Sequence, residues 1–310
     1  MARQDERTDL GLRIWTQTGV ASASLHLGHL TEALTRSDEA IALGRGDPHA
    51  GLDLVGFRPY LNHLFGRGWI LRLLGRLAEA AQALDQTIAL AEQHGDWVPG
   101  SVAHTEYAQL CDFTGDVRAA VAHARVAVEL AEKTGNLTVR VGAFGALGLA
   151  NVLDGQWREA LDALGQALAI ARERRLALSE AQLLTRLARA QLGLGDTSSA
   201  RATAEEAIVV ARRRGTRTLE IEAHIVLGRV LIHAGARRDE VEKPLEVARR
   251  LVEETGARGH LPFIHLECAA LARVLGDDTS RQRELRAAHR LFTEMGAPIR
   301  AEQAVRELGA

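Results

Sequence analysis

The chain is poor in aromatic residues and in cysteine, and both shortages limit the classes of fold that it can adopt. Phe, Trp and Tyr make up 4% of the 310 residues, whereas hydrophobic residues as a whole make up 46%. Ala and Leu must therefore fill most of the core, which favours helices packed closely side by side. The two cysteines, Cys111 and Cys268, lie far apart and form no CxxC pair. No disulfide framework is expected, and a reducing cytoplasm is predicted.

Long apolar runs and an excess of one charge are also missing. The longest uncharged stretch, Val141 to Leu153, is too short to cross a bilayer. The polar start, Met1 to Asp9, lacks the apolar core of a signal peptide. A formal net charge of −2, from 38 basic and 40 acidic residues, argues against a large nucleic-acid surface. We expect a soluble cytoplasmic protein that binds neither membrane nor nucleic acid directly.

Motifs for catalysis and for metal binding are absent from the sequence. We find no HExxH, no GxSxG and no phosphate-binding GxxxxGK[ST]. His26 and His29 lie on either side of Gly28, and His260 and His265 are five residues apart, so neither pair suits a metal on one helix face. Both cysteines are interpreted as buried, inert thiols. We therefore predict no catalytic residues, no metal and no cofactor.

A repeat of about 40 residues dominates the sequence. Seven similar segments, such as "LGRLAEAA" and "DGQWREAL", each centre on a glycine, and a left-handed glycine is a usual helix end. Successive glycines are 47, 40, 40, 40, 40 and 41 residues apart. The seven are Gly28, Gly75, Gly115, Gly155, Gly195, Gly235 and Gly276.

Small residues recur at fixed distances after these glycines. Alanine stands five residues after five of them and twelve residues after another set of five, which places both on one face of a following helix. The first set is Ala33, Ala80, Ala120, Ala160 and Ala200, and the second is Ala40, Ala127, Ala167, Ala207 and Ala288. Each glycine is thus predicted to join two helices. Four central pairs are expected at 98–114 with 117–135, 137–154 with 157–175, 177–194 with 197–214, and 217–234 with 238–256.

The period implies one elongated array with short appendages. Residues 1–9 are predicted to be a polar tail, 10–296 the array, 44–58 a long loop within it, and 297–310 a capping helix that opens at Pro298. In such arrays each unit contacts only its neighbours and leaves an open concave groove.

The segment Phe144 to Ala171, "FGALGLANVLDGQWREALDALGQALAIA", resembles the tetratricopeptide repeat. This resemblance implies an all-α fold, a right-handed superhelical solenoid of about seven helix pairs. The tail from Glu284 to Leu308 is similar to the end of large bacterial regulators that carry an ATPase module before such repeats. Some of these begin with an adenylate or guanylate cyclase domain, and others carry a LuxR-type DNA-binding domain.

Ligand-binding residues of such an array are expected on the first helix of each pair, about thirteen, ten, six and three positions before its glycine. Two features stay open to two interpretations. Gly142 and Gly145 either widen the groove for a ligand or allow tight packing, and Phe65 with Trp69 form either an interface anchor or core. The candidate groove residues are Asn62, Phe65, Trp69, Arg72, Thr105, Gln109, Asp112, Gly142, Gly145, Arg189, Glu222 and Arg229.

These observations predict a non-catalytic scaffold for protein interaction or signal sensing. Its partner would be a peptide, a protein, a small-molecule effector, or an attached ATPase or output domain, as the resemblance implies. The alternative is a structural oligomerisation module that pairs with a second copy as a homodimer.

Overall fold

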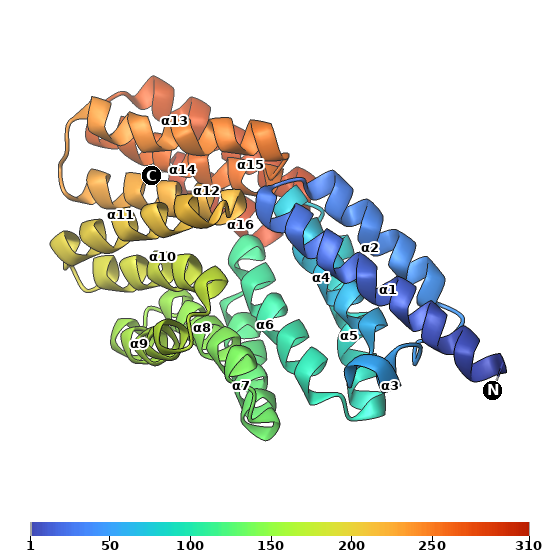
Figure 1. Cartoon of the computed structure of the whole chain (residues 1–310). Helices are drawn as coiled ribbons and strands as arrows, with labels where there is room; N and C mark the ends of the chain where they lie inside the picture. Colours follow the sequence, from blue (N-terminus) through green and yellow to red (C-terminus); the bar gives the residue numbers. More distant parts are fainter. Residues whose placement is uncertain (1, 310) are drawn as a thin grey trace.

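The computed structural model describes residues 2–309, and the side chains of residues 9–176 and 178–309. Within this range all regular structure is helical, and consecutive helices form antiparallel pairs (Figure 1). The first pairs are α1 (Ala2–Leu27) with α2 (Leu30–Gly44), α4 (Pro59–Leu74) with α5 (Leu77–His94), and α6 (Trp97–Thr114) with α7 (Val117–Thr134).

The later pairs repeat the same unit. They are α8 (Leu137–Leu153) with α9 (Trp157–Glu173), α10 (Ala177–Gly193) with α11 (Thr197–Arg214), α12 (Arg217–His233) with α13 (Arg238–Thr255), and α14 (Leu261–Val274) with α15 (Asp278–Met295). A short 3₁₀ helix, η1 (Arg258–His260), precedes α14, and α16 (Pro298–Gly309) follows α15. The helices from α6 to α13 begin and end within two residues of the predicted positions.

The N-terminal region differs from the prediction in detail. Residues 2–9, expected to be a polar tail, form the start of α1, which suits their content of Ala, Arg, Gln and Glu. The predicted loop 44–58 holds a one-turn helix, α3 (Leu52–Val55). The start of α3 lies close to α1: a Cβ on Gly11 of α1 would lie 2.4 Å from the backbone of Gly51, the residue before α3.

The repeated glycines and alanines do what their spacing predicts. All seven turn glycines have positive φ, from +64° to +86°, the left-handed conformation that ends a helix at little cost for glycine. All ten repeated alanines have 0% exposed surface, so each lets a neighbouring helix approach closely. The described part of the chain is therefore an all-α repeat solenoid.

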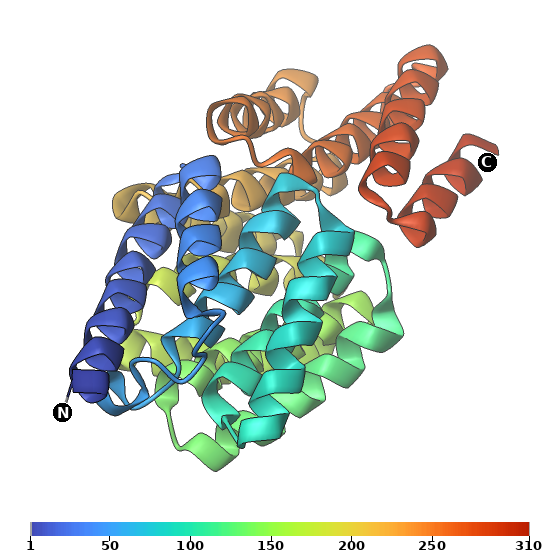
Figure 2. The same cartoon turned by 90° about the vertical axis from the view of Figure 1, so that its right-hand side faces the viewer.

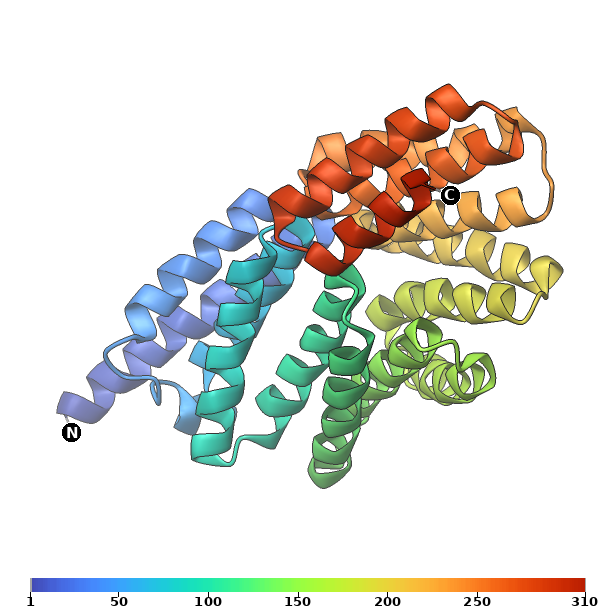
Figure 3. The same cartoon turned by 180° about the vertical axis from the view of Figure 1, so that it is seen from behind.

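The solenoid closes on itself, which the sequence did not predict. The first pair packs on α12 and α13: Leu25 and Leu30 share a cluster with Ile221, Ile225 and Leu251. The ends of α4 and α6 meet η1 and α16 (Figures 1 and 3). From the side, the N-terminal helices stand against the C-terminal half of the array (Figure 2). The expectation that each pair contacts only its neighbours is wrong, because the superhelix brings its ends together.

Candidate functional site

A cavity of about 420 Å³ lies inside the closed superhelix. Its walls come from α6, α8, α9, α10, α12, α14 and α16, together with η1, so residues almost 190 positions apart face the same space. The apolar residues of the lining include Trp157, Leu192, Ile225, Phe263 and Leu266. The charged or polar residues include Asp112, Arg189, Glu222, Arg229, His260 and Arg300.

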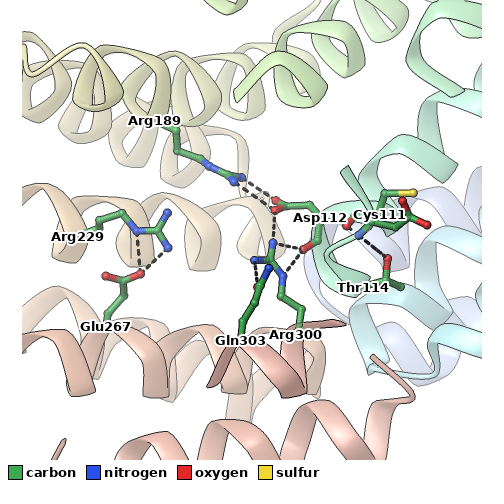
Figure 4. A network of polar contacts seen from close by, with 9 residues as sticks. Cys111, Asp112, Thr114, Arg189, Arg229, Glu267, Arg300 and Gln303 are labelled. Atoms are coloured by element: carbon green, nitrogen blue, oxygen red, sulfur yellow. Dashed lines mark hydrogen bonds and ion pairs between the residues drawn. The ribbon is translucent and has the colours of Figure 1, made fainter. Parts of the chain in front are cut away.

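Asp112, near the end of α6, binds two arginines at once (Figure 4). Arg189 of α10 donates from Nη1 and Nη2 to its two carboxylate oxygens, at 2.6 and 3.2 Å. Arg300 of α16 donates from Nη2 to Oδ1 at 3.2 Å and to the backbone carbonyl of Asp112 at 2.6 Å. Burial opposes ionisation of this carboxyl, but the two guanidinium groups outweigh it and hold the pKa of Asp112 well below its usual range.

A second ion pair lies across the cavity from Asp112 (Figure 4). Arg229 of α12 donates from Nε and Nη2 to one oxygen of Glu267, at 2.8 and 2.5 Å. Glu267 is 5% exposed whereas Arg229 is 32% exposed, so the arginine is the partner that reaches the open space. Burying a carboxylate is costly unless it is paired and hydrogen-bonded, and Arg229 supplies both contacts to Glu267.

Further polar residues extend the network away from the cavity. Arg72 donates to Glu106 at 3.4 Å and to Gln109 at 3.3 Å, and Gln182 donates to Gln109 at 2.9 Å. Arg186 is 2% exposed, and burial lowers its pKa to about 10 although Glu222 and Glu106 oppose the shift. The interior of the superhelix is thus filled with charges rather than with apolar side chains alone.

His260 lies at the junction of η1 and α14, on the cavity wall. It is 4% exposed, its ring meets the ring of Phe113 edge-on at 5.3 Å, and its Nε2 has no hydrogen-bond partner. Burial, with the charge of Arg72, lowers the pKa of His260 to about 3. The ring is therefore neutral at physiological pH.

The structure brings some of the predicted groove residues together and separates the others. Asp112, Arg189, Glu222 and Arg229 line the cavity. Arg72 and Gln109 belong to the adjoining network. The remaining predicted side chains, Asn62, Phe65, Trp69 and Thr105, do not line the cavity.

Phe65 and Trp69 are half-buried and pack against two different apolar clusters. Trp69 packs with the cluster around Leu25, Ile70 and Ile221, and its ring lies 5.6 Å from that of His26. Phe65 packs with another cluster, around Leu71 and Leu84. Both side chains therefore lie at the edge of the apolar core.

The two helix glycines differ from each other. A Cβ on Gly145 would lie 2.9 Å from Leu183 and 3.2 Å from Nη1 of Arg186, so this glycine admits a neighbouring helix. A Cβ on Gly142 would meet only Thr105, at 3.8 Å, which is an ordinary contact. Tight packing explains Gly145, and nothing in the structure explains Gly142.

Several cavity residues were missed by the sequence analysis. Arg300 was missed because only first helices were considered, and it comes from α16. Phe263 and Leu266 lie thirteen and ten residues before Gly276, so extending the same rule to the seventh pair would have found them. Trp157 packs over Gly193, where a Cβ would lie 2.4 Å from its ring, and it also lines the cavity.

Other sequence-based candidates have ordinary surroundings. Burial raises the pKa of the Cys111 thiol to about 12 and that of Cys268 to about 11, so both stay protonated. His265 binds Glu284 at 2.7 Å. Among the described residues no cluster of three or more His, Cys, Asp or Glu is arranged to hold a metal ion. None of the helices in the described range combines the length and the apolar character that a membrane span requires.

A family model matches more than half of the chain. The model, described as anaphase-promoting complex subunit 5, matches residues 16–54, 60–114, 146–179 and 178–226. These segments cover most of α1 to α6 and the stretch from the second half of α8 to the middle of α12. No curated protein matches the sequence significantly.

Comparison with solved structures gives likenesses over nearly the whole chain. The Rap conjugation gene regulator of the plasmid pLS20, in complex with the Phr* peptide, has a TM-score of 0.70 at 14% identity, over 97% of this chain and 79% of that chain. A Rap protein complexed with competence and sporulation factor has a TM-score of 0.59 at 13% identity, covering 95% and 96%. Aspartyl phosphate phosphatase F from Bacillus subtilis has a TM-score of 0.52 at 10% identity, covering 96% and 93%. At these identities the likeness concerns the fold.

Proposed function

Because the chain belongs to the helical-repeat family whose model is described as anaphase-promoting complex subunit 5, we propose that it is a non-catalytic interaction scaffold. Its ligand is a peptide, or a short segment of a partner protein, bound in the cavity between the two halves of the superhelix. The observation that carries this proposal is a cavity of about 420 Å³ lined by both apolar side chains and convergent charged groups. Ligand sites have this combination, in which apolar surface supplies affinity and a few polar groups fix orientation.

The solved structures support a peptide as the ligand. One similar structure is a Rap regulator in complex with a peptide, and the fold of that protein covers almost all of this chain. A second is a Rap protein complexed with competence and sporulation factor. A solenoid of this shape therefore accommodates such ligands in other proteins.

The regulatory setting is a finer part of the proposal. The likeness of residues 284–308 to bacterial ATPase regulators supports a role as the sensing region of a cyclase-associated or LuxR-type regulator. The cavity offers a mechanism by which a bound ligand could change the superhelix, because its walls come from α6 as well as from α14 and α16. A ligand that contacts both halves would stabilise the closed superhelix, and an attached domain would sense that change.

A selection experiment tests the binding proposal. A random peptide library displayed on its own mRNA is selected against the purified chain, and the enriched peptides are synthesised and measured by calorimetry. Leu192→Trp places a large ring on the cavity wall. The matched control is Leu194→Trp, two residues further on, where the side chain is 44% exposed and does not line the cavity.

The proposal predicts that Leu192→Trp weakens the selected peptides at least about tenfold and that Leu194→Trp leaves their affinity unchanged. Circular dichroism checks that both variants keep the helical fold. Peptides that bind both variants as well as they bind the natural chain would contradict a cavity site.

A further inference from the structure

The interior of the superhelix carries more positive than negative groups. Five arginines, Arg72, Arg186, Arg189, Arg229 and Arg300, share the network with four carboxylates, those of Glu106, Asp112, Glu222 and Glu267. Asp112 forms ion pairs with both Arg189 and Arg300. His260 adds no charge. The interior is therefore short of one negative charge.

Polar atoms at the cavity also lack partners. Nε2 of His260 and Nε of Arg189 are buried without a hydrogen bond. Arg229 uses Nε and Nη2 on Glu267, and its third nitrogen makes no hydrogen bond to any described residue. A buried polar group without a partner is costly, so the two buried nitrogens favour a polar occupant, and the free nitrogen of Arg229 can donate to an occupant that accepts hydrogen bonds.

The cavity lining also contains apolar side chains. The rings of Trp157 and Phe263, with Leu192 and Leu266, face the same space as the guanidinium groups of the cavity, those of Arg189, Arg229 and Arg300. An occupant that satisfies both kinds of lining residue has an anionic end and an apolar body.

We propose that the cavity binds a carboxylate at the end of an apolar body, with the carboxylate held by Arg229 and His260 and the body against Trp157 and Phe263. This inference rests on the proposed function and names the chemistry of its ligand. One negative charge balances the surplus guanidinium. A cationic end would meet Arg189, Arg229 and Arg300, and a dianion would exceed the surplus and face Asp112 and Glu222. The C-terminal end of a short apolar peptide and a free aliphatic acid share this chemistry.

The test uses two pools of tripeptides built from Leu, Ile, Val and Phe at every position. One pool has a free C-terminal carboxylate and the other a C-terminal amide, and a third arm uses octanoate. Each is mixed with the full chain, and bound species are measured by size-exclusion separation and mass spectrometry. The use of pools means that the result does not depend on one chosen tripeptide sequence. The C-terminal amide removes the negative charge of the peptide and keeps its apolar side chains.

Two substitutions change the proposed contact in opposite directions. Arg229→Gln removes the guanidinium, and Glu267→Gln removes the carboxylate that competes for it. Arg238→Gln is the matched control, because Arg238 also binds one glutamate, Glu242, but lies 66% exposed on α13. The Glu267→Gln arm remains informative if Arg229→Gln fails to fold.

We expect the acid pool to be retained at least about tenfold more than the amide pool. Retention falls in Arg229→Gln, rises in Glu267→Gln and is unchanged in Arg238→Gln. Retention of the acid tripeptides identifies a peptide end as the source, and retention of octanoate alone identifies a free acid; both support the carboxylate. Equal retention of acid and amide, no retention of any probe, or an unchanged result in Glu267→Gln would overturn the inference. If the selected peptides still bind in a manner sensitive to Leu192→Trp, the proposed function stands without it.

Discussion

Gly75, which ends α4, lies against Gly259 of η1, although 184 positions separate them in the sequence. A Cβ on Gly75 would be 3.5 Å from the backbone nitrogen and Cα of Gly259, and a Cβ on Gly259 would be 2.6 Å from the carbonyl oxygen of Arg72. Backbone meets backbone at this point. The close approach is one of the places where the superhelix closes.

Gly259→Ala should therefore destabilise the chain. The added methyl group meets backbone that cannot rotate away, and overpacking of this kind costs about 1–3 kcal/mol. The control is Gly66→Ala inside α4, where a Cβ has nothing within 4 Å. That change should stabilise the chain by up to about 1 kcal/mol, the usual preference for alanine within a helix. Urea unfolding followed by circular dichroism measures both, and a neutral Gly259→Ala would argue against the closure.

Replacing Arg175 by glycine should stabilise the chain. A second series of left-handed glycines ends the second helix of most pairs, at Gly95, Gly135, Gly215, Gly256 and Gly296. Arg175 stands after α9, where this series would place a glycine, and it has the same left-handed conformation, with φ +55°. A left-handed residue with a side chain costs roughly 1–2 kcal/mol. Arg175→Gly should raise the free energy of unfolding by about 0.5–1 kcal/mol.

The reciprocal substitution is the control for Arg175. Gly135 has φ +63° and open space around it, so Gly135→Arg tests the conformation without a clash. It should lower the free energy of unfolding by about 1 kcal/mol. If both variants melt at the temperature of the natural chain, the backbone conformation at residue 175 differs from the one described.

Stability should fall as the pH drops below about 6.5. Burial lowers the pKa of His260 to about 3, and burial with the charge of His123 lowers that of His104 to about 4. Their ordinary value is 6.5. Between these limits the unfolded chain binds protons that the folded chain does not, so acid favours unfolding; above about pH 6.5 the stabilisation is fully present.

His104→Gln should weaken this pH dependence. His104 lies on α6 with its Nδ1 2.8 Å from Nδ1 of His123 on α7, and Asp85 and Asp116 act on His123 from nearby. Urea unfolding at several pH values between 4 and 8 gives the slope. His233→Gln is the control, because that side chain is exposed. Equal slopes in the natural chain and in His104→Gln would show that His104 titrates alike in both states.

The local architecture could be predicted from the sequence because the period fixes it. A left-handed glycine in every unit, with one or two buried alanines in most units, indicates where each helix ends and which face packs, so the helices from α6 to α13 were placed within two residues. Asp112, Arg189, Glu222 and Arg229 were placed in the groove by the same register.

The closure could not be predicted, because it depends on the sum of small rotations between successive pairs. That sum decides whether Arg300 of α16 reaches Asp112 of α6, and no local pattern encodes it. His260 and Glu267 belong to the site for the same reason. Asn62, Phe65 and Trp69 were placed in the groove by register, but none of them lines the cavity, and Phe65 and Trp69 pack against apolar clusters instead.

A double-mutant cycle between Asp112 and Arg300 tests the closed superhelix most directly. Asp112→Asn, Arg300→Gln and the double variant are compared with the natural chain by urea unfolding. The closed structure predicts that the two single losses do not add, with a coupling energy of about 1–3 kcal/mol, because the side chains are in contact. Additive losses, with a coupling energy near zero, would show that residues 112 and 300 do not meet and that the superhelix is open.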